Sequence, residues 1–138
     1  DRVYHHTAPV NMNFGIREAL RLLSEEGLEN SWNRHRQNAE KLWDGLESLG
    51  LELHVRKEFR LPTLTTVRVP QGLDSKAFNL HLLNNYGIEV GAGLGDLAGK
   101  VWRIGLMGYN STSENVEKIL NIFESELPKF KDRITFAA

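Results

Sequence analysis

The sequence predicts one α/β (α+β) domain, with a small, mainly antiparallel sheet and helices packed on one of its faces. Its 138 residues have the length of a single ordinary domain. Hydrophobic residues make up 41% and charged residues 25%, as in globular proteins rather than disordered chains. The spacing of apolar residues switches between helical and alternating, which gives the order helix, helix, strand, strand, helix, strand, strand, helix.

Two helices open this order. Apolar residues recur at three- and four-residue spacing over residues 11–26, between Pro9 and Gly27. This stripe consists of Met12, Ile16, Ala19, Leu20 and Leu23. A second helix is expected over residues 29–49, ended by Gly50. Its stripe consists of Trp32, Ala39, Leu42, Trp43, Leu46 and Leu49.

Alternating apolar and polar residues predict short strands in the middle of the chain. The four expected strands cover residues 51–55, 63–69, 88–90 and 101–107. Asp74 is expected to cap a helix that runs to Tyr86 and stops at Gly87, with Ala77, Phe78, Leu82 and Leu83 available for burial. After the last strand, the capping-box pattern of residues 111–114 predicts a final helix that Pro128 ends. Its apolar stripe consists of Val116, Ile119, Leu120, Phe123 and Leu127.

The composition argues against several classes of function. A net charge of −1 provides no broad basic surface for nucleic acid or an anionic membrane. The absence of cysteine excludes disulfides, thiolate zinc sites and a cysteine nucleophile. No apolar run approaches the roughly 18 residues of a membrane span. The chain starts at Asp1 with a dense polar and aromatic stretch, which leads us to expect the interior of a longer polypeptide.

Arg103 is the strongest functional candidate in the residue pattern. Trp102, Ile104 and Leu106 would face the core, which turns Arg103 to the opposite side of its strand. Gly105 leaves space beside it, and a guanidinium matches a carboxylate or a phosphate with two parallel hydrogen bonds. The alternative is a solvated arginine on an open sheet face, which the pattern taken alone favours.

The glycine-rich residues 91–95 favour a flexible or tight connection over a phosphate cradle. They lack the spacing G-x-G-x-x-G, and a strand rather than a helix follows them. A dinucleotide site is therefore not expected, although the loop could approach a ligand closely.

The stretch Tyr4-His5-His6-Thr7 offers hydroxyl groups on Tyr4 and Thr7 that could donate to a phosphate. Its two adjacent histidines have no metal-binding spacing, so no metal site is expected. An ordinary loop before Pro9 explains the stretch equally well. The other histidines, His35, His54 and His81, are interpreted as structural.

As a set, and in this order, several stretches resemble the alanine–glyoxylate (serine–pyruvate) aminotransferases. They are Tyr4-His5-His6-Thr7-Ala8-Pro9, Arg17-Glu18-Ala19-Leu20, Glu26-Gly27-Leu28-Glu29-Asn30-Ser31-Trp32, Arg60-Leu61-Pro62-Thr63, Thr65-Thr66-Val67, Gly93-Leu94-Gly95, Arg103-Ile104-Gly105-Leu106 and Gly108-Tyr109-Asn110. The similarity extends to about Leu127.

The resemblance implies the C-terminal small domain of a fold-type I, class V enzyme that uses pyridoxal 5'-phosphate. Residues 1–10 would then link it to a large cofactor-binding domain, and residues 11–138 would form the small domain. Tyr4 and Thr7 would bind the cofactor phosphate across a homodimer. Arg103 would bind the α-carboxylate of small amino acids and 2-oxo acids, with alanine or serine as donor and glyoxylate or pyruvate as acceptor.

One consequence of the resemblance limits this chain. The lysine that forms the Schiff base precedes the Tyr4 stretch in the family, and none of the seven lysines here matches it. We therefore expect no catalytic residue in this chain and no activity of the chain alone. An intracellular location, peroxisomal or mitochondrial, is implied by the family, although Phe136-Ala137-Ala138 is not a peroxisomal signal.

Two alternatives remain open from the sequence. One is a related transaminase acting on 3-hydroxykynurenine, in which the same domain would serve. The other is a non-catalytic α/β module for binding or dimerisation, which the composition and the order of elements also allow.

Overall fold

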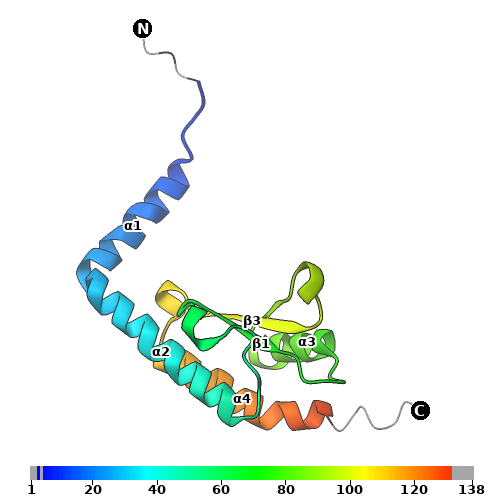
Figure 1. Ribbon diagram of the computed structural model, residues 1–138. Coiled ribbons are helices and arrows are strands. Elements are labelled where there is room, and N and C mark those ends of the chain that lie inside the picture. The colour runs from blue at the N-terminus through cyan, green and yellow to red at the C-terminus, as the bar shows by residue number, and fades with distance from the viewer. Residues whose placement is uncertain (1–2, 4, 132–138) are drawn as a thin grey trace. The chain divides into compact units, whose positions relative to one another are not determined.

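The computed structural model describes residue 3 and residues 5–131, and the chain forms two compact units, Asp1–Asn33 and Arg34–Ala138 (Figure 1). The first unit contains α1 (Val10–Glu26) and the start of α2 (Leu28–Ser48). Gly27 separates the two helices with a φ of +83°, a backbone conformation that glycine adopts without steric cost. The remainder of α2 and every strand belong to the second unit.

A three-stranded antiparallel sheet forms the centre of the second unit. Its strands are β1 (Leu64–Arg68), β2 (Gly91–Ala92) and β3 (Val101–Gly105), in the spatial order β1-β3-β2. The register places Arg103 opposite Thr66 on one side and opposite Gly91 on the other. The predicted fold class, a small antiparallel sheet with helices, is confirmed.

The core lies between one face of this sheet and three helices, α2, α3 (Ser75–Tyr86) and α4 (Ser113–Lys131) (Figure 1). Trp102 of β3 is fully buried, and its ring contacts those of Phe78 and Phe123 at centroid distances of 5.1 and 5.7 Å. Trp43 of α2 donates from Nε1 to Oγ1 of the buried Thr65, at 2.8 Å. The core-facing side chains of both long strands therefore contact helices on the same side.

Two predicted strands are wrong. Residues 51–55 form only an isolated bridge between Leu53 and Val67, before the chain turns into a short 3₁₀ helix, Lys57–Phe59. Residues 88–90 form no strand, and the pairing with β3 starts at Gly91. In both segments the apolar residues pack against the core without a continuing ladder of hydrogen bonds, so alternation alone overstated the sheet.

The final helix also differs from its prediction at both ends. Thr112 is its cap, because Oγ1 of Thr112 accepts from the backbone N–H of Asn115 at 3.1 Å. Ser111 is instead fully buried and receives a hydrogen bond from Asn38 Nδ2 at 3.3 Å. Pro128 lies inside α4, which continues to Lys131, because a proline in the last turn removes a single N–H.

Helix α1 is amphipathic as predicted, but none of its residues is buried. Met12, Ile16 and Leu20 are between 58% and 67% exposed, and Trp32 of α2 is 62% exposed. In contrast, Ala39, Leu42 and Leu46 are fully buried in the core of the second unit. Helical periodicity thus identified the apolar faces of both helices, but among the described residues only the face of α2 that lies in the second unit is buried.

The cap of α3 allows a test of the local fold. Oδ1 of Asp74 accepts from the backbone N–H of Ala77 at 3.0 Å, as predicted. Replacing Asp74 with alanine should lower the free energy of unfolding by about 1 kcal/mol, because one N–H of the first turn loses its partner. Urea denaturation measures this change. Asp74→Asn, which keeps an acceptor oxygen, is the matched control, and an equal loss in both variants would contradict the capping role.

Candidate functional site

Arg103 occupies the middle of the central strand, on the face opposite the core. Its neighbours Trp102 and Ile104 are 0% and 5% exposed, whereas Arg103 itself is half-buried. Adjacent residues of a strand point to opposite faces, so the buried neighbours fix the side on which the guanidinium lies. This is the arrangement that the residue pattern predicted.

The backbone of β2 orients the guanidinium. Nε of Arg103 donates to the carbonyl oxygen of Ala92 at 2.8 Å. Gly91, opposite Arg103 in the register, has no side chain, and a Cβ at this position would lie in van der Waals contact with Nη2 of Arg103, at 3.5 Å. One hydrogen bond thus holds the base of the guanidinium, while the absent side chain leaves room beside its terminal nitrogens.

Arg103 also differs from Arg60 and Arg68, each of which forms an ion pair with a glutamate. Arg60 pairs with Glu47 at 2.8 Å, and Arg68, on the same sheet face as Arg103, pairs with Glu52 at 3.0 Å. Among the described residues, none forms an ion pair with Arg103, whose one hydrogen bond runs to a backbone carbonyl. A fixed guanidinium without a carboxylate partner is suited to bind a small carboxylate or phosphate through two parallel hydrogen bonds.

Thr7, one of the two predicted cofactor ligands, lies in the first unit. Tyr4 is outside the described residues. Thr7 is exposed in the irregular segment before α1, and its hydroxyl makes no hydrogen bond to any residue that the structure describes. A free hydroxyl can donate to a phosphate oxygen, so the donor chemistry of Thr7 fits the predicted ligand. Thr7 belongs to the first unit and Arg103 to the second, so each residue is described only within its own unit.

Two histidines of the second unit, His35 and His81, have structural partners, whereas Nδ1 of His54 is buried without a hydrogen-bond partner among the described residues. Nε2 of His35 accepts from the backbone N–H of Gly108 at 3.0 Å. His81 contacts Glu126 at 2.8 Å. In the first unit, the rings of His5 and His6 contact only one another among described residues. Over residue 3 and residues 5–131, no three potential metal ligands gather into a group.

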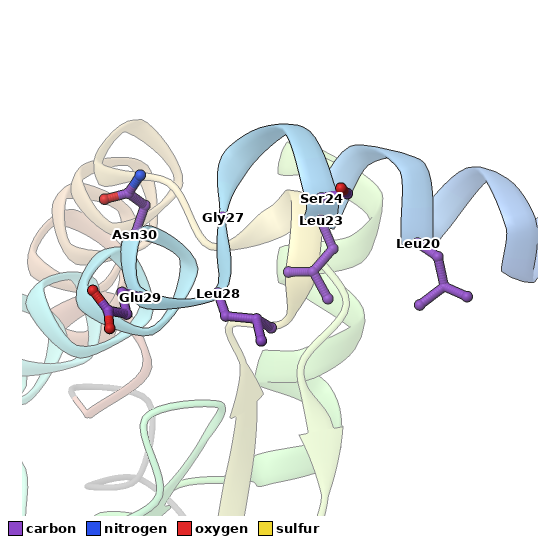
Figure 2. A pocket seen from close by; sticks show the side chains of 7 residues that line it. All are labelled: Leu20, Leu23, Ser24, Gly27, Leu28, Glu29 and Asn30. Carbon is purple, nitrogen blue, oxygen red and sulfur yellow. The ribbon is translucent and has the colours of Figure 1, made fainter.

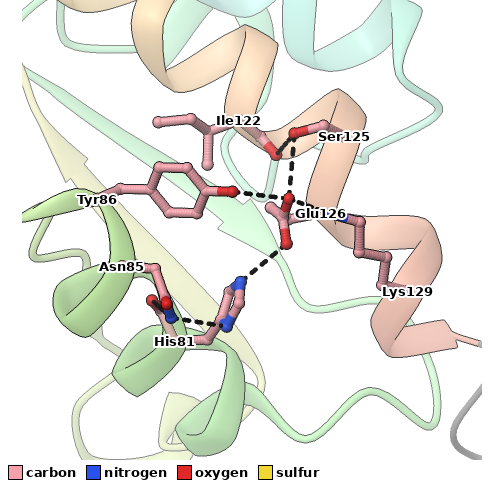
Figure 3. A network of polar contacts seen from close by, with 7 residues as sticks. All are labelled: His81, Asn85, Tyr86, Ile122, Ser125, Glu126 and Lys129. Carbon is pink, nitrogen blue, oxygen red and sulfur yellow. Dashed lines mark hydrogen bonds and ion pairs between the residues drawn. The ribbon is translucent and has the colours of Figure 1, made fainter.

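A buried carboxylate network, which was not among the predicted features, joins α3 to α4 (Figure 3). Glu126 is 3% exposed and accepts from the hydroxyl of Tyr86 at 2.7 Å. His81 and Lys129 also contact this carboxylate. Hydrogen bonds from Lys129 and then Tyr86 lower the pKa of Glu126 from 4.5 to about 2, although its burial acts in the opposite direction. The position of Glu126 three residues after Phe123, on the apolar side of the helix, was the available signal.

A hollow lies in the first unit, at the bend between α1 and α2 (Figure 2). Its volume is about 690 Å³, and Leu20, Leu23 and Leu28 point the same way along it. Glu29 is its single ionisable lining residue. The three leucines give this hollow an apolar side suited to packing, and its polar lining residues are Ser24, Glu29 and Asn30.

Gly91 and Ala92, which were predicted to belong to a connection, form β2, and residues 93–100 connect β2 to β3. This connection contains a short 3₁₀ helix, Gly95–Leu97. None of the described helices is long and apolar enough to cross a membrane.

The family described as Aminotransferase class-V matches residues 1–119 of the chain. Alanine–glyoxylate aminotransferase of Callithrix jacchus is 50% identical over 127 residues, which cover 91% of this chain and 31% of the relative. The chain therefore spans about a third of the length of the curated relatives that it matches.

Solved structures that resemble this chain are also aminotransferases. The crystal structure of alanine–glyoxylate aminotransferase from Nostoc sp. is 60% identical, with a TM-score of 0.86, and the match covers 91% of this chain and 33% of that one. Ureidoglycine–glyoxylate aminotransferase from Bacillus subtilis is 38% identical, with a TM-score of 0.87, and the match covers 96% and 34% of the two chains.

Proposed function

Because this chain belongs to the aminotransferase class-V family, we propose that it is the C-terminal part of an enzyme that transfers an amino group from alanine or serine to glyoxylate or pyruvate. The coverage of about a third of each relative makes the chain one portion of such an enzyme. The names of the relatives above share glyoxylate, which supports glyoxylate as the acceptor.

The single observation that carries this proposal is the guanidinium of Arg103, held at Nε by Ala92 and free of a carboxylate partner among described residues. Amino donors and 2-oxo acceptors both bear a carboxylate next to the reacting carbon. One arginine can therefore bind the substrate of each half-reaction in the same orientation. Such a contact fixes the Cα–H bond of the donor toward the base that removes its proton.

The proposed cofactor is pyridoxal 5'-phosphate, with the hydroxyls of Tyr4 and Thr7 donating to its phosphate in a homodimer. When bound, the cofactor supplies an electron sink for the charge that develops at the substrate Cα. The exposed, unengaged hydroxyl of Thr7 supports this part of the proposal. The lysine that carries the cofactor is expected outside this chain, so Arg103 positions the substrate without performing the chemistry.

An activity assay tests the proposed function. The enzyme that carries this chain, supplied with pyridoxal phosphate, should convert alanine and glyoxylate into pyruvate and glycine, and the formation of glycine measures the transfer. The 138-residue chain assayed alone is the control and should form no glycine. Parallel assays with serine, ureidoglycine and 3-hydroxykynurenine as donors separate the related transaminases. Failure to transaminate any of these donors would favour the non-catalytic module.

A further inference from the structure

We infer that Gly93 is a positioning residue for Arg103, because it keeps the turn after β2 closed in the form that presents the Ala92 carbonyl to the guanidinium. The inference rests on the proposed function, in which Arg103 binds the substrate carboxylate. It assigns a role to a residue that does not itself contact Arg103.

The turn leaves no space for a side chain at Gly93. A Cβ there would lie 2.0 Å from the carbonyl oxygen of Leu97, 2.6 Å from its carbonyl carbon and 2.9 Å from Cγ2 of Val101. The first two atoms are backbone, which cannot rotate away as the end of a flexible side chain can. The Leu97 carbonyl is also fixed, because it accepts from the backbone N–H of Lys100 at 3.0 Å.

A single peptide unit connects this crowded turn to Arg103. The carbonyl of Ala92 and the N–H of Gly93 belong to the same planar peptide group. Its N–H donates to the carbonyl oxygen of Val101 at 3.0 Å, and its carbonyl oxygen accepts from Nε of Arg103 at 2.8 Å. Because the group is rigid, a rotation of it that relieves a clash at Gly93 also displaces the oxygen that holds Arg103.

The consequence concerns the orientation of the guanidinium rather than its charge. With Nε engaged by Ala92, the two terminal nitrogens form the fork that matches a carboxylate. Without that anchor the arginine remains charged but samples several rotamers, so part of the binding free energy is used to order it. Loss of Gly93 should therefore weaken the binding of carboxylate substrates.

Kinetics of the full enzyme test this inference. Gly93→Ala should raise the KM for alanine about 10-fold and change kcat less than about threefold, since the lost contact binds substrate and transition state alike. In an Arg103→Ala background, Gly93→Ala should change KM less than about twofold, because the group that it orients is gone. An equal rise in KM with and without Arg103 would overturn the inference.

Gly99→Ala in the same loop is the matched control. Gly99 has a φ of +71°, so alanine is strained there, but its Cβ would meet no atom within 4 Å. This variant should lose folding stability and keep the KM for alanine. A KM that rises as much as in Gly93→Ala would assign the effect to general loosening of the loop and overturn the positioning role.

A measurement on the unmutated chain keeps the inference testable even if Gly93→Ala fails to fold. NMR should detect scalar coupling across the hydrogen bond between ¹⁵Nε of Arg103 and the ¹³C carbonyl of Ala92. An Nε–H of Arg103 that exchanges freely with solvent and lacks this coupling would overturn the inference. If Arg103→Ala leaves the KM unchanged, the proposed function fails instead, so the two failures are distinguishable.

Discussion

Replacing Arg103 with alanine in the full enzyme should raise the KM for the amino donor by roughly 30- to 150-fold. A charge-assisted, bidentate contact contributes on the order of 2–3 kcal/mol, and each 1.4 kcal/mol corresponds to about a factor of 10. Steady-state kinetics with alanine and with glyoxylate measure the effect, which should appear for both substrates because both carry the carboxylate. Cofactor binding should persist, because the predicted phosphate ligands are Tyr4 and Thr7.

Arg68→Ala is the matched control for Arg103→Ala. Arg68 extends from the same face of the sheet, but it is paired with Glu52 at 3.0 Å, so it has no comparable capacity for a ligand. Its loss should leave KM nearly unchanged. A further comparison uses ethylamine, which lacks the carboxylate of alanine. The preference for alanine over ethylamine should fall in Arg103→Ala and stay unchanged in Arg68→Ala. An unchanged KM in Arg103→Ala would refute the carboxylate assignment.

Glu126→Gln should lower the free energy of unfolding by about 2 kcal/mol at neutral pH. Hydrogen bonds to a charged group contribute about 1.5–3 kcal/mol, and glutamine keeps the shape but not the charge that Tyr86, His81 and Lys129 face. Chemical denaturation of the chain measures the loss. Glu124→Gln on the same helix is the control, since Glu124 is exposed and should change stability little.

The stabilisation by Glu126 should depend on pH in a defined direction. Its pKa is lowered from 4.5 to about 2 in the folded chain, chiefly by the hydrogen bond from Lys129 and then by that from Tyr86. The folded carboxyl thus binds a proton less readily than the unfolded one, so its contribution is complete above pH 4.5 and is lost as the pH falls toward 2. The stability difference between the unmutated chain and Glu126→Gln should shrink over that range. A difference that stays constant down to pH 2 would contradict the role of the charge.

Local signals in the sequence identified the elements that local interactions determine. Asp74 caps α3 as predicted, and Trp102 and Ile104 are buried as their alternation requires. The position of Arg103 on the open face follows from those two neighbours. Each of these features depends on residues within a few positions of one another, which is the range over which periodicity and capping patterns carry information.

Features that depend on distant partners could not be predicted in the same way. His81 and Glu126 are separated by 45 residues, and neither residue type indicates the other. The anchor of Arg103 is a backbone carbonyl, so it has no signature in the residue identities. The strands predicted at residues 51–55 and 88–90 were wrong for the same reason. A ladder of hydrogen bonds needs a partner strand of matching length as well as an alternating pattern.

The alternation along β3 makes this strand intolerant of insertions and deletions. Trp102 and Ile104 supply the core, and Arg103 between them supplies the proposed ligand contact. A slip of one residue would exchange the two faces, placing a guanidinium among the rings of Phe78 and Phe123 and an indole at the open surface. Length variation in this region is therefore restricted to the connections outside Val101–Gly105, whereas substitutions on the open face can change ligand preference without altering the core.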